Sequence, residues 1–183
     1  EQCPASIEHV QKLVDMRRYL VLSEGAMPAE LQLTFRNLEQ NGNPWGLGWA
    51  TRENWLEGLG VKLAEEGEMG QETILYWPGC AGAFDERNKK VSLALVKLFQ
   101  AAGVDFAVLG NREKCCGDAA RRLGNEYLYQ MLAVENIENL KALGVETIVT
   151  QCPHCYNTLK HEYPRFGGQF RVLHHSEFLA GLI

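Results

Sequence analysis

The chain has 183 residues, 46% of them hydrophobic and 22% charged, which excludes a disordered or low-complexity protein and predicts a globular core. The formal net charge is -5, so there is no surplus of Lys and Arg to neutralise phosphates, and we expect no binding to nucleic acid. The apolar stretches are short and interrupted, whereas a membrane-spanning helix needs about 20 apolar residues. We therefore expect any association with a membrane to go through partners.

The first part of the chain, residues 1–70, has a helical pattern. Apolar residues recur at intervals of three and four, which predicts a helix over 5–22. A second helix is expected to begin at Pro28 and to end at 41–44, where Gly and Pro disfavour its continuation. Residues 65–68 are expected to form an exposed connection. Three tryptophans in a Gly-rich stretch lack basic neighbours and are interpreted as pinning an irregular segment to the core: Trp45, Trp49 and Trp55.

The second part, residues 71–183, alternates between strand and helix patterns. Four β-branched or aromatic runs are predicted as strands: 73–77, 105–109, 146–150 and 170–173. The segments between and after them are predicted as helices: 86–102, 125–143, 156–163 and a last helix capped by Ser176. This alternation predicts an α/β fold with a parallel sheet of about four strands flanked by helices, preceded by an α-helical N-terminal region.

The six cysteines are not distributed like a disulfide framework. Such frameworks stabilise short secreted domains that cannot build a core, and a chain of this size can build one. The cysteines also fall in tight groups, Cys115-Cys116 and Cys152-Pro153-His154-Cys155, instead of being spread among loops. This grouping favours metal or redox chemistry in a reducing compartment.

Three of the predicted strands each lead to cysteines. Cys80 follows the first strand, Cys115 and Cys116 follow the second, and Cys152 follows the third. Because ligand sites of open parallel sheets form outside the carboxyl ends of the strands, five thiols are expected to meet at one edge. Soft sulfur ligands select zinc, cuprous ion or iron–sulfur clusters. Adjacent side chains diverge and fit one tetrahedral ion poorly, which favours a multi-iron cluster, while one zinc with a spare thiol stays as the alternative.

The cysteine motifs resemble a known family. Trp77-Pro78-Gly79-Cys80, Cys115-Cys116-Gly117-Asp118 and Cys152-Pro153-His154-Cys155 are similar to the cysteine-rich CCG domain. That domain occurs in heterodisulfide reductase catalytic subunits and in their relatives in glycolate, glycerol-3-phosphate and lactate oxidation. The resemblance covers about 77–175. It implies a four-iron four-sulfur cluster, which in the heterodisulfide reductase catalytic subunit is of the noncubane type. Other CCG units of the family can hold zinc instead.

The resemblance also implies which residues bind the cluster. The expected ligands are the five grouped cysteines: Cys80, Cys115, Cys116, Cys152 and Cys155. His154 is interpreted as a hydrogen-bonding neighbour, and of His174 and His175 one is expected to pack and the other to cap a helix. Gly79, Gly82 and Gly117 are expected to let the backbone approach the cluster closely. Arg121 and Arg122, just after Asp118, suit either the docking of an acidic partner or anionic substrate, or an exposed helix start.

Cys3-Pro4 suggests a second, separate site. A bacterial ferredoxin run ends in Cys-Pro, and relatives carry such a motif ahead of a helix and a CCG unit. We therefore expect 1–70 to be the helical remainder of a ferredoxin-type domain and a linker, and 71–183 to be the CCG domain. In this interpretation the chain is a fragment of a longer protein, and Cys3 is a ligand of a ferredoxin cluster in the full-length protein only.

Taken with the resemblance, the sequence predicts an iron–sulfur electron-transfer subunit of an oxidoreductase. Its implied partners are ferredoxin-type, flavoprotein or quinone-reducing redox subunits. The expected location is the cytoplasm, or the cytoplasmic face of a membrane through those partners. One rival is a structural zinc-binding or interaction module of a redox complex. Another is a metal-free thiol–disulfide enzyme that uses Cys152 and Cys155, which leaves the other three cysteines of the group unexplained.

Overall fold

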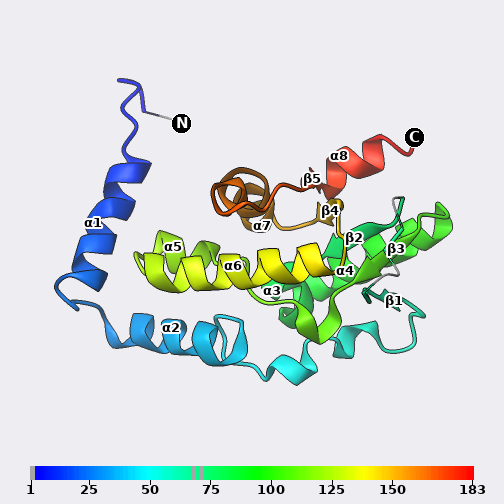
Figure 1. The fold of residues 1–183 in the computed structure, drawn as a ribbon, viewed down its shortest axis with the longest axis horizontal. Helices are drawn as coiled ribbons and strands as arrows, with labels where there is room; N and C mark the ends of the chain where they lie inside the picture. The colour runs from blue at the N-terminus through cyan, green and yellow to red at the C-terminus, as the bar shows by residue number, and fades with distance from the viewer. Residues whose placement is uncertain (1–2, 67–68, 71) are drawn as a thin grey trace.

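A computed structural model describes residues 3–66, 69–70 and 72–183, and it places a parallel sheet at the centre of the chain (Figure 1). The sheet has five strands in the order β1-β3-β2-β4-β5. Their bounds are Lys62–Leu63 (β1), Ile74–Trp77 (β2), Phe106–Val108 (β3), Thr147–Thr150 (β4) and Arg171–His174 (β5). All four pairings are parallel. The α/β prediction is confirmed.

The four predicted strands are present, and the sheet has one more strand than expected. β1 has only two residues, both exposed, so it lacks the hydrophobic run that identifies a buried strand in a sequence. It pairs with β3 at the edge of the sheet, Lys62 beside Ala107 and Leu63 beside Val108. A strand from the N-terminal part of the chain thus extends the sheet of the C-terminal part. Residues 67 and 68 of the connection expected between these parts lie outside the described residues.

Alternate residues of β2, β3, β4 and β5 face two separate hydrophobic clusters, as the period of a strand requires. Leu75 and Trp77 of β2 belong to one cluster, whereas Ile74 and Tyr76 belong to the other. The first cluster also holds residues of α2 (Ala29–Asn41) and α6 (Glu126–Ala142), and Figure 1 shows α6 running along the sheet. The second holds residues of α4 (Glu86–Ala101) and α8 (His175–Ala180). Helices therefore cover both faces.

Several helix boundaries differ from the predictions. α1 spans Val10–Leu22, because Ser6 has a positive φ of 53° and helical backbone begins only later. The short helix α3 (Gly79–Phe84) was not expected, since six residues are too few for a periodic pattern. The other short helix, α5 (Asp118–Arg122), begins where a helix start was one of the two interpretations. The predicted helix 156–163 begins earlier, with α7 at Pro153–Asn157, and continues as the π-helix Thr158–Glu162 and a 3-10 turn, Tyr163–Phe166.

The cap of the last helix was also wrongly assigned. Ser176 lies inside α8, and His174 occupies the N-cap position. The Glu177 carboxylate accepts a hydrogen bond from the backbone N–H of His174 at 2.9 Å, which fixes the start of the helix. One of the two histidines thus stands at the helix cap, as expected.

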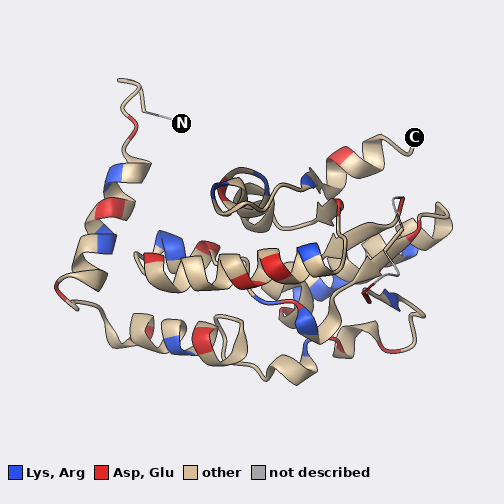
Figure 2. Cartoon of the chain, viewed as in Figure 1, with Lys and Arg blue, Asp and Glu red and all other residues tan. Residues whose placement is uncertain are grey.

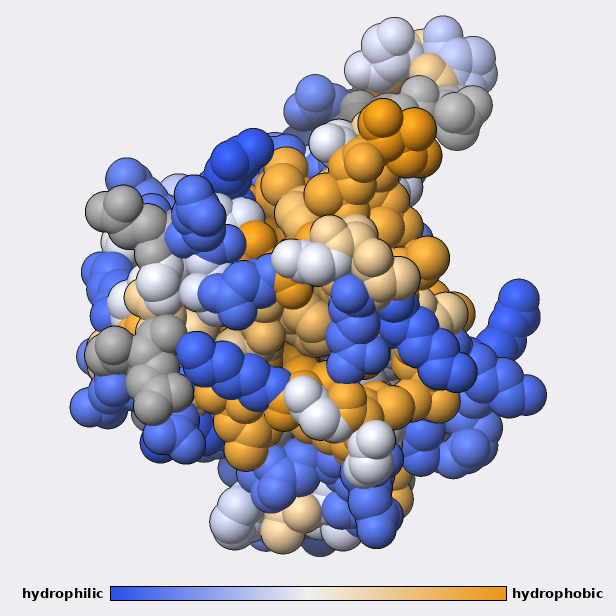
Figure 3. Space-filling view, turned by 90° about the vertical axis from the view of Figure 1, so that its right-hand side faces the viewer, coloured by the Kyte–Doolittle hydropathy of each residue, from blue (hydrophilic) through white to orange (hydrophobic). Residues whose placement is uncertain are grey.

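The surface carries both signs of charge. Figure 2 shows residues of both signs on α1, α2 and α6, and the charged residues of α6 are mostly acidic. Figure 3 shows hydrophobic residues gathered in the middle of one face, with hydrophilic residues around them. Across the described ranges, none of the helices is long and apolar enough to cross a membrane.

Candidate metal centre

The cysteines lie where the strand order reverses. From β2 the chain passes through α4 to β3 on one side, and then through α6 to β4 on the other side of β2. Open α/β sheets bind ligands at such a switch point, outside the carboxyl ends of the strands. Cys80 lies in α3 directly after β2, Cys115 and Cys116 follow β3 and a 3-10 turn, and Cys152 is the N-cap residue of α7 after β4. The expected common edge is confirmed.

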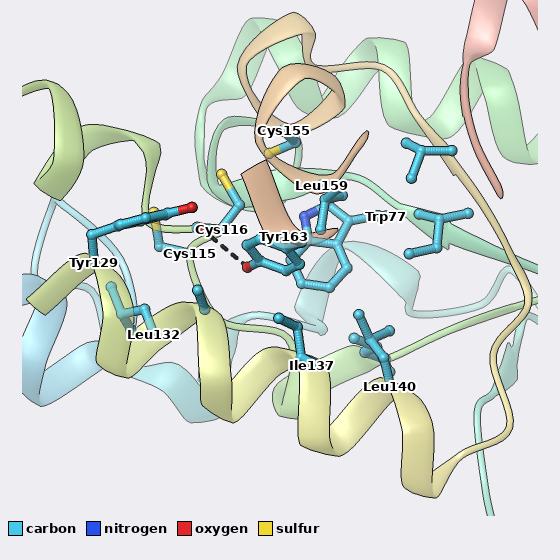
Figure 4. Close-up of a cluster of buried hydrophobic side chains, with 14 of the residues drawn as sticks. Trp77, Cys115, Cys116, Tyr129, Leu132, Ile137, Leu140, Cys155, Leu159 and Tyr163 are labelled. Carbon is cyan, nitrogen blue, oxygen red and sulfur yellow. Dashed lines mark hydrogen bonds between the residues drawn. The ribbon is translucent and has the colours of Figure 1, made fainter. Parts of the chain in front are cut away.

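The five cysteine side chains act on one another's pKa in a continuous line, in the order Cys80, Cys115, Cys116, Cys155, Cys152. Cys115 raises the pKa of Cys80, and Cys116 raises that of Cys115. Cys155 lowers the pKa of both Cys116 and Cys152. Figure 4 shows the sulfur ends of Cys116 and Cys155 turned toward the same space. Residues from three separate loops therefore form one thiol cluster, and none of its described sulfur contacts involves Cys3.

The contacts within the line divide the thiols into two kinds. The pKa of Cys116 is lowered because Cys115 and Cys155 donate to its sulfur. The pKa of Cys152 is lowered to about 6 because the Cys155 thiol and nearby backbone N–H groups donate to it. The same neighbours, together with burial, raise the pKa of Cys115 and Cys155. The surroundings therefore favour the thiolate at Cys116 and Cys152 and the thiol at Cys115 and Cys155.

The backbone of the Cys115-Cys116 pair is held on both sides. The N–H of Cys115 donates to the carbonyl oxygen of Gly42, at the end of α2, at 2.7 Å. The buried Asn136 amide of α6 donates to the Cys115 carbonyl oxygen at 3.0 Å. The Tyr163 hydroxyl donates to the Cys116 carbonyl oxygen at 3.0 Å and accepts from Asn136. These bonds hold the backbone from which both sulfurs project.

Two glycines give the backbone room at the cluster. Gly79 has a φ of +75°, and a Cβ there would lie 3.0 Å from the Cys155 sulfur. Gly117 has a φ of +90°, and a Cβ there would lie 2.7 Å from Cδ2 of Tyr129. Both positions require the left-handed conformation that side chains other than glycine disfavour. Gly82 does not share this role, because it packs against Ser92 and Gln151 instead.

A buried ion pair lies against one end of the line. Arg52 and Glu113 are 2% and 3% exposed, and their side chains meet at 2.6 Å. Nη2 of Arg52 also lies 3.5 Å from the sulfur of Cys80. Burial by itself lowers the pKa of Arg52, but Cys80 and Glu113 together raise it, so Arg52 stays charged. A fixed positive charge therefore faces the Cys80 sulfur and partly opposes the rise in the pKa of Cys80 that Cys115 and burial cause.

The polar residues after the cysteine pair are more buried than expected. Asp118 is 7% and Arg121 8% exposed, so neither an exposed helix start nor a docking site for a partner describes Arg121. Arg121 donates to the buried Glu162 carboxylate at 2.6 Å. Asp118 accepts from Arg122 and lies 3.0 Å from Nδ1 of His154. His154 is thus a hydrogen-bonding neighbour of the site.

The donor set suits a thiolate-bound metal group. Five sulfurs without oxygen ligands match iron–sulfur clusters or other soft metals. Within the described residues no three Cys, His, Asp or Glu side chains surround a single point as one bound ion requires, which agrees with thiols hydrogen-bonded in a line. Two buried donors beside the line, Tyr129 Oη and Trp77 Nε1, have no hydrogen-bond partner in the described structure. Buried donors without protein acceptors fit a site that takes up a group rich in acceptor atoms.

Several residues of the site could not be found from the sequence. Arg52 and Gly42 lie in the N-terminal part of the chain, far from any cysteine motif. Three more residues lie in α6 or later in the chain: Tyr129, Asn136 and Tyr163. In a helical segment, a single tyrosine or asparagine cannot be distinguished by its spacing from an ordinary core or surface residue. No signal in one sequence marks these five residues.

Fold and site together define a cysteine-rich α/β domain with its cysteines at the switch point. Residues 74–160 match the family model of the cysteine-rich domain CCG, so this segment belongs to that family. Over its full length the chain is 50% identical to "EtfAB:quinone oxidoreductase" of Syntrophomonas wolfei and 46% identical to "Probable iron-sulfur-binding oxidoreductase FadF" of Bacillus subtilis. Over 99% of its length it is 30% identical to a subunit of the dihydromethanophenazine:CoB–CoM heterodisulfide reductase of Methanosarcina mazei.

The chain spans only part of these relatives. It covers 26% of the first, 27% of the second and 44% of the third. All three are oxidoreductases or their subunits by name, as the resemblance implied. Zinc finds no support in these comparisons. No solved structure matches the chain.

Proposed function

We propose that the chain is an iron–sulfur electron-transfer segment of a heterodisulfide reductase-like oxidoreductase. The proposal assigns one four-iron four-sulfur cluster to the five cysteines of the line: Cys80, Cys115, Cys116, Cys152 and Cys155. The observation that supports it most is the meeting of these five sulfurs, from three loops, at the switch point of the sheet. The iron–sulfur names of relatives that match the whole chain support the same conclusion.

The side chains around the line have defined tasks in this proposal. A bound cluster supplies reversible one-electron transfer. Arg52 offsets part of the negative charge that five thiolates bring into a buried site. Asn136 and Tyr163 hold the cysteine pair through its carbonyl oxygens, and the hydrophobic cluster around Cys115, Cys116 and Cys155 excludes water. Shielding from water and hydrogen bonds near sulfur are the means by which a protein sets a cluster's potential.

The partners of the full-length protein follow from the same proposal. The relatives named above are an EtfAB:quinone oxidoreductase and a heterodisulfide reductase subunit. We infer redox subunits of ferredoxin, flavoprotein or quinone-reducing type as the donors and acceptors of electrons, with a cytoplasmic site or membrane face as the location. In this scheme 1–70 contains the end of a ferredoxin-type domain, and Cys3 serves a cluster of that domain.

Anaerobic reconstitution with iron and sulfide tests the proposal. The expected product is brown, absorbs near 400 nm and contains about four irons per chain, because five thiolates exceed the needs of one tetrahedral ion. Cys115→Ser and Cys116→Ser are each expected to change the cluster, since all five thiolates are its ligands in this proposal. Cys3→Ser is the matched control and should leave the iron content unchanged. A colourless protein with one zinc, tolerant of Cys115→Ser or Cys116→Ser, would refute the proposal and support a structural zinc module.

A further inference from the structure

Tyr129 of α6 carries a buried hydroxyl group that none of the described residues satisfies. The residue is 1% exposed, and its Oη has no hydrogen-bond partner within the described ranges. The other two buried tyrosines are satisfied, because Tyr76 donates to Gln151 at 2.8 Å and Tyr163 donates to the Cys116 carbonyl oxygen at 3.0 Å. A buried donor without an acceptor costs about 1–3 kcal/mol, so native proteins rarely retain one without a use.

The ring of Tyr129 is held so that its hydroxyl cannot turn away. Its edge packs against Phe166, with the ring centroids 5.8 Å apart, and the Arg121 guanidinium lies 5.7 Å from the ring centroid. Gly117 approaches the ring so closely that an added Cβ would lie 2.7 Å from Cδ2. Gly117 directly follows Cys116, so the ring is fixed against the loop that carries the cysteine pair.

The hydroxyl group faces the cysteines. In Figure 4 it points toward the side on which Cys116 and Cys155 lie, and the charge of the Cys116 sulfur acts on it. Burial raises the pKa of Tyr129 above its ordinary value, with Glu162 adding to the effect, so the group keeps its proton and can donate. The Tyr129 hydroxyl group can donate one hydrogen bond, and it points toward the position that the cysteine thiolates and the cluster sulfides occupy in the proposed function.

We propose that the Tyr129 hydroxyl donates a hydrogen bond to a sulfur of the bound cluster and thereby raises the cluster's reduction potential, an inference that rests on the function proposed above. Reduction adds negative charge to a cluster and its sulfurs. A hydrogen bond to sulfur therefore stabilises the reduced state more than the oxidised state. The rival partner is the second carboxylate oxygen of Glu162, which is also buried without a partner in the described structure and which an intervening water could link to Tyr129.

The test compares Tyr129→Phe with wild type and with Tyr127→Phe. Tyr127 is on the same helix and 69% exposed, so its substitution removes a hydroxyl group without touching the site. Each protein is unfolded with urea in its metal-free form, and each is then reconstituted anaerobically with iron and sulfide. Iron and sulfide contents are measured, and the midpoint potential is determined by redox titration followed by electron paramagnetic resonance.

The expected result has three parts. Metal-free Tyr129→Phe is at least as stable as wild type, because an unsatisfied hydroxyl group has been removed without changing the ring. Its iron and sulfide contents equal those of wild type. Its midpoint potential shifts to a more negative value, whereas that of Tyr127→Phe does not shift.

Two outcomes would overturn the inference while leaving the proposed function intact. One is an unchanged potential in Tyr129→Phe, which would assign the hydroxyl group to Glu162. The other is a marked loss of stability in metal-free Tyr129→Phe, which would show that the hydroxyl group already has a partner in the fold. A wild-type protein that takes up no iron would overturn the proposed function, and this inference with it.

Discussion

Replacing Arg52 with Met tests how strongly the buried ion pair supports the fold. The change keeps most of the side-chain volume but leaves Glu113, 3% exposed, without the guanidinium that lies 2.6 Å away. Removing one partner of a buried pair costs about 3–5 kcal/mol, because a desolvated charge remains uncompensated. Domains of this kind have total stabilities of about 5–15 kcal/mol. We expect Arg52→Met to lose a large part of the free energy of unfolding, measured by urea denaturation of the metal-free protein.

The loss should depend on pH in a defined direction. Burial raises the pKa of Glu113, and Arg52 opposes this effect, so removing Arg52 raises that pKa further. When folding raises the pKa of a carboxyl group, the protonated form of that group stabilises the fold. This stabilisation is lost as the pH rises through the pKa of the group in the folded protein. The difference between Arg52→Met and wild type should therefore shrink from pH 8 toward pH 5, by up to about 1.4 kcal/mol per pH unit for one proton.

Two controls separate the pair from other effects. Arg52→Met combined with Glu113→Gln removes the unpaired charge, so part of the stability should return and the extra pH dependence should vanish. Lys89→Met breaks the exposed pair with Glu86, 2.8 Å apart, and should cost less than about 1 kcal/mol. A loss below about 1 kcal/mol in Arg52→Met at pH 7.5, or a loss that is constant with pH, would refute the reasoning.

Two further predictions concern the cysteine line. Gly117→Ala should lose about 1–2 kcal/mol from its left-handed backbone and more from the contact with Tyr129, whereas Gly144→Ala, with a φ of +72° and nothing within 4 Å, should lose the backbone part alone. Equal losses in urea denaturation would show that the ring does not confine Gly117. In the metal-free protein, the rate at which iodoacetamide labels Cys152 should rise with a midpoint near pH 6, because the Cys155 thiol lowers the pKa of Cys152 to about 6. Cys80, whose pKa is raised by its hydrogen bond to Cys115 and by burial, should stay unlabelled at pH 7 by mass spectrometry, and equal labelling of both would contradict the order of the thiols.

The strands that carry the site could be predicted because each is a short buried run with a clear end. Ile74–Trp77 and Thr147–Thr150 are apolar or β-branched, and each is followed directly by a cysteine motif. Parallel strands place their carboxyl ends at one edge, so the meeting of the cysteines followed from the order of strands and motifs alone. The edge strand Lys62–Leu63 could not be predicted, because its pairing with β3 depends on where the chain passes in space and not on local hydrophobicity.

The supporting residues could not be predicted for a related reason. The contact of Arg52 with Cys80 joins positions 28 apart in the chain, and that of Asn136 with the Cys115 carbonyl oxygen joins positions 21 apart. Neither pairing has a sequence period, since both depend on how helices pack on the sheet. The expectation of an exposed Arg121 failed similarly, because Glu162, which makes its burial possible, is the last residue of the π-helix that follows α7, 41 positions away in the chain. Sequence patterns located the cysteines, and tertiary packing determined their charge environment.

The site extends beyond the segment that defines the family. The family model matches 74–160, yet Arg52 contacts Cys80 and the carbonyl of Gly42 accepts from Cys115. A protein reduced to the matched segment would leave Glu113 buried without its cation and the Cys115 N–H without its acceptor. The relatives match the whole chain and not only this segment, as expected if the N-terminal part and the cysteine-rich part work as one unit. The N-terminal part is therefore better understood as one wall of the thiol cluster than as a connection to it.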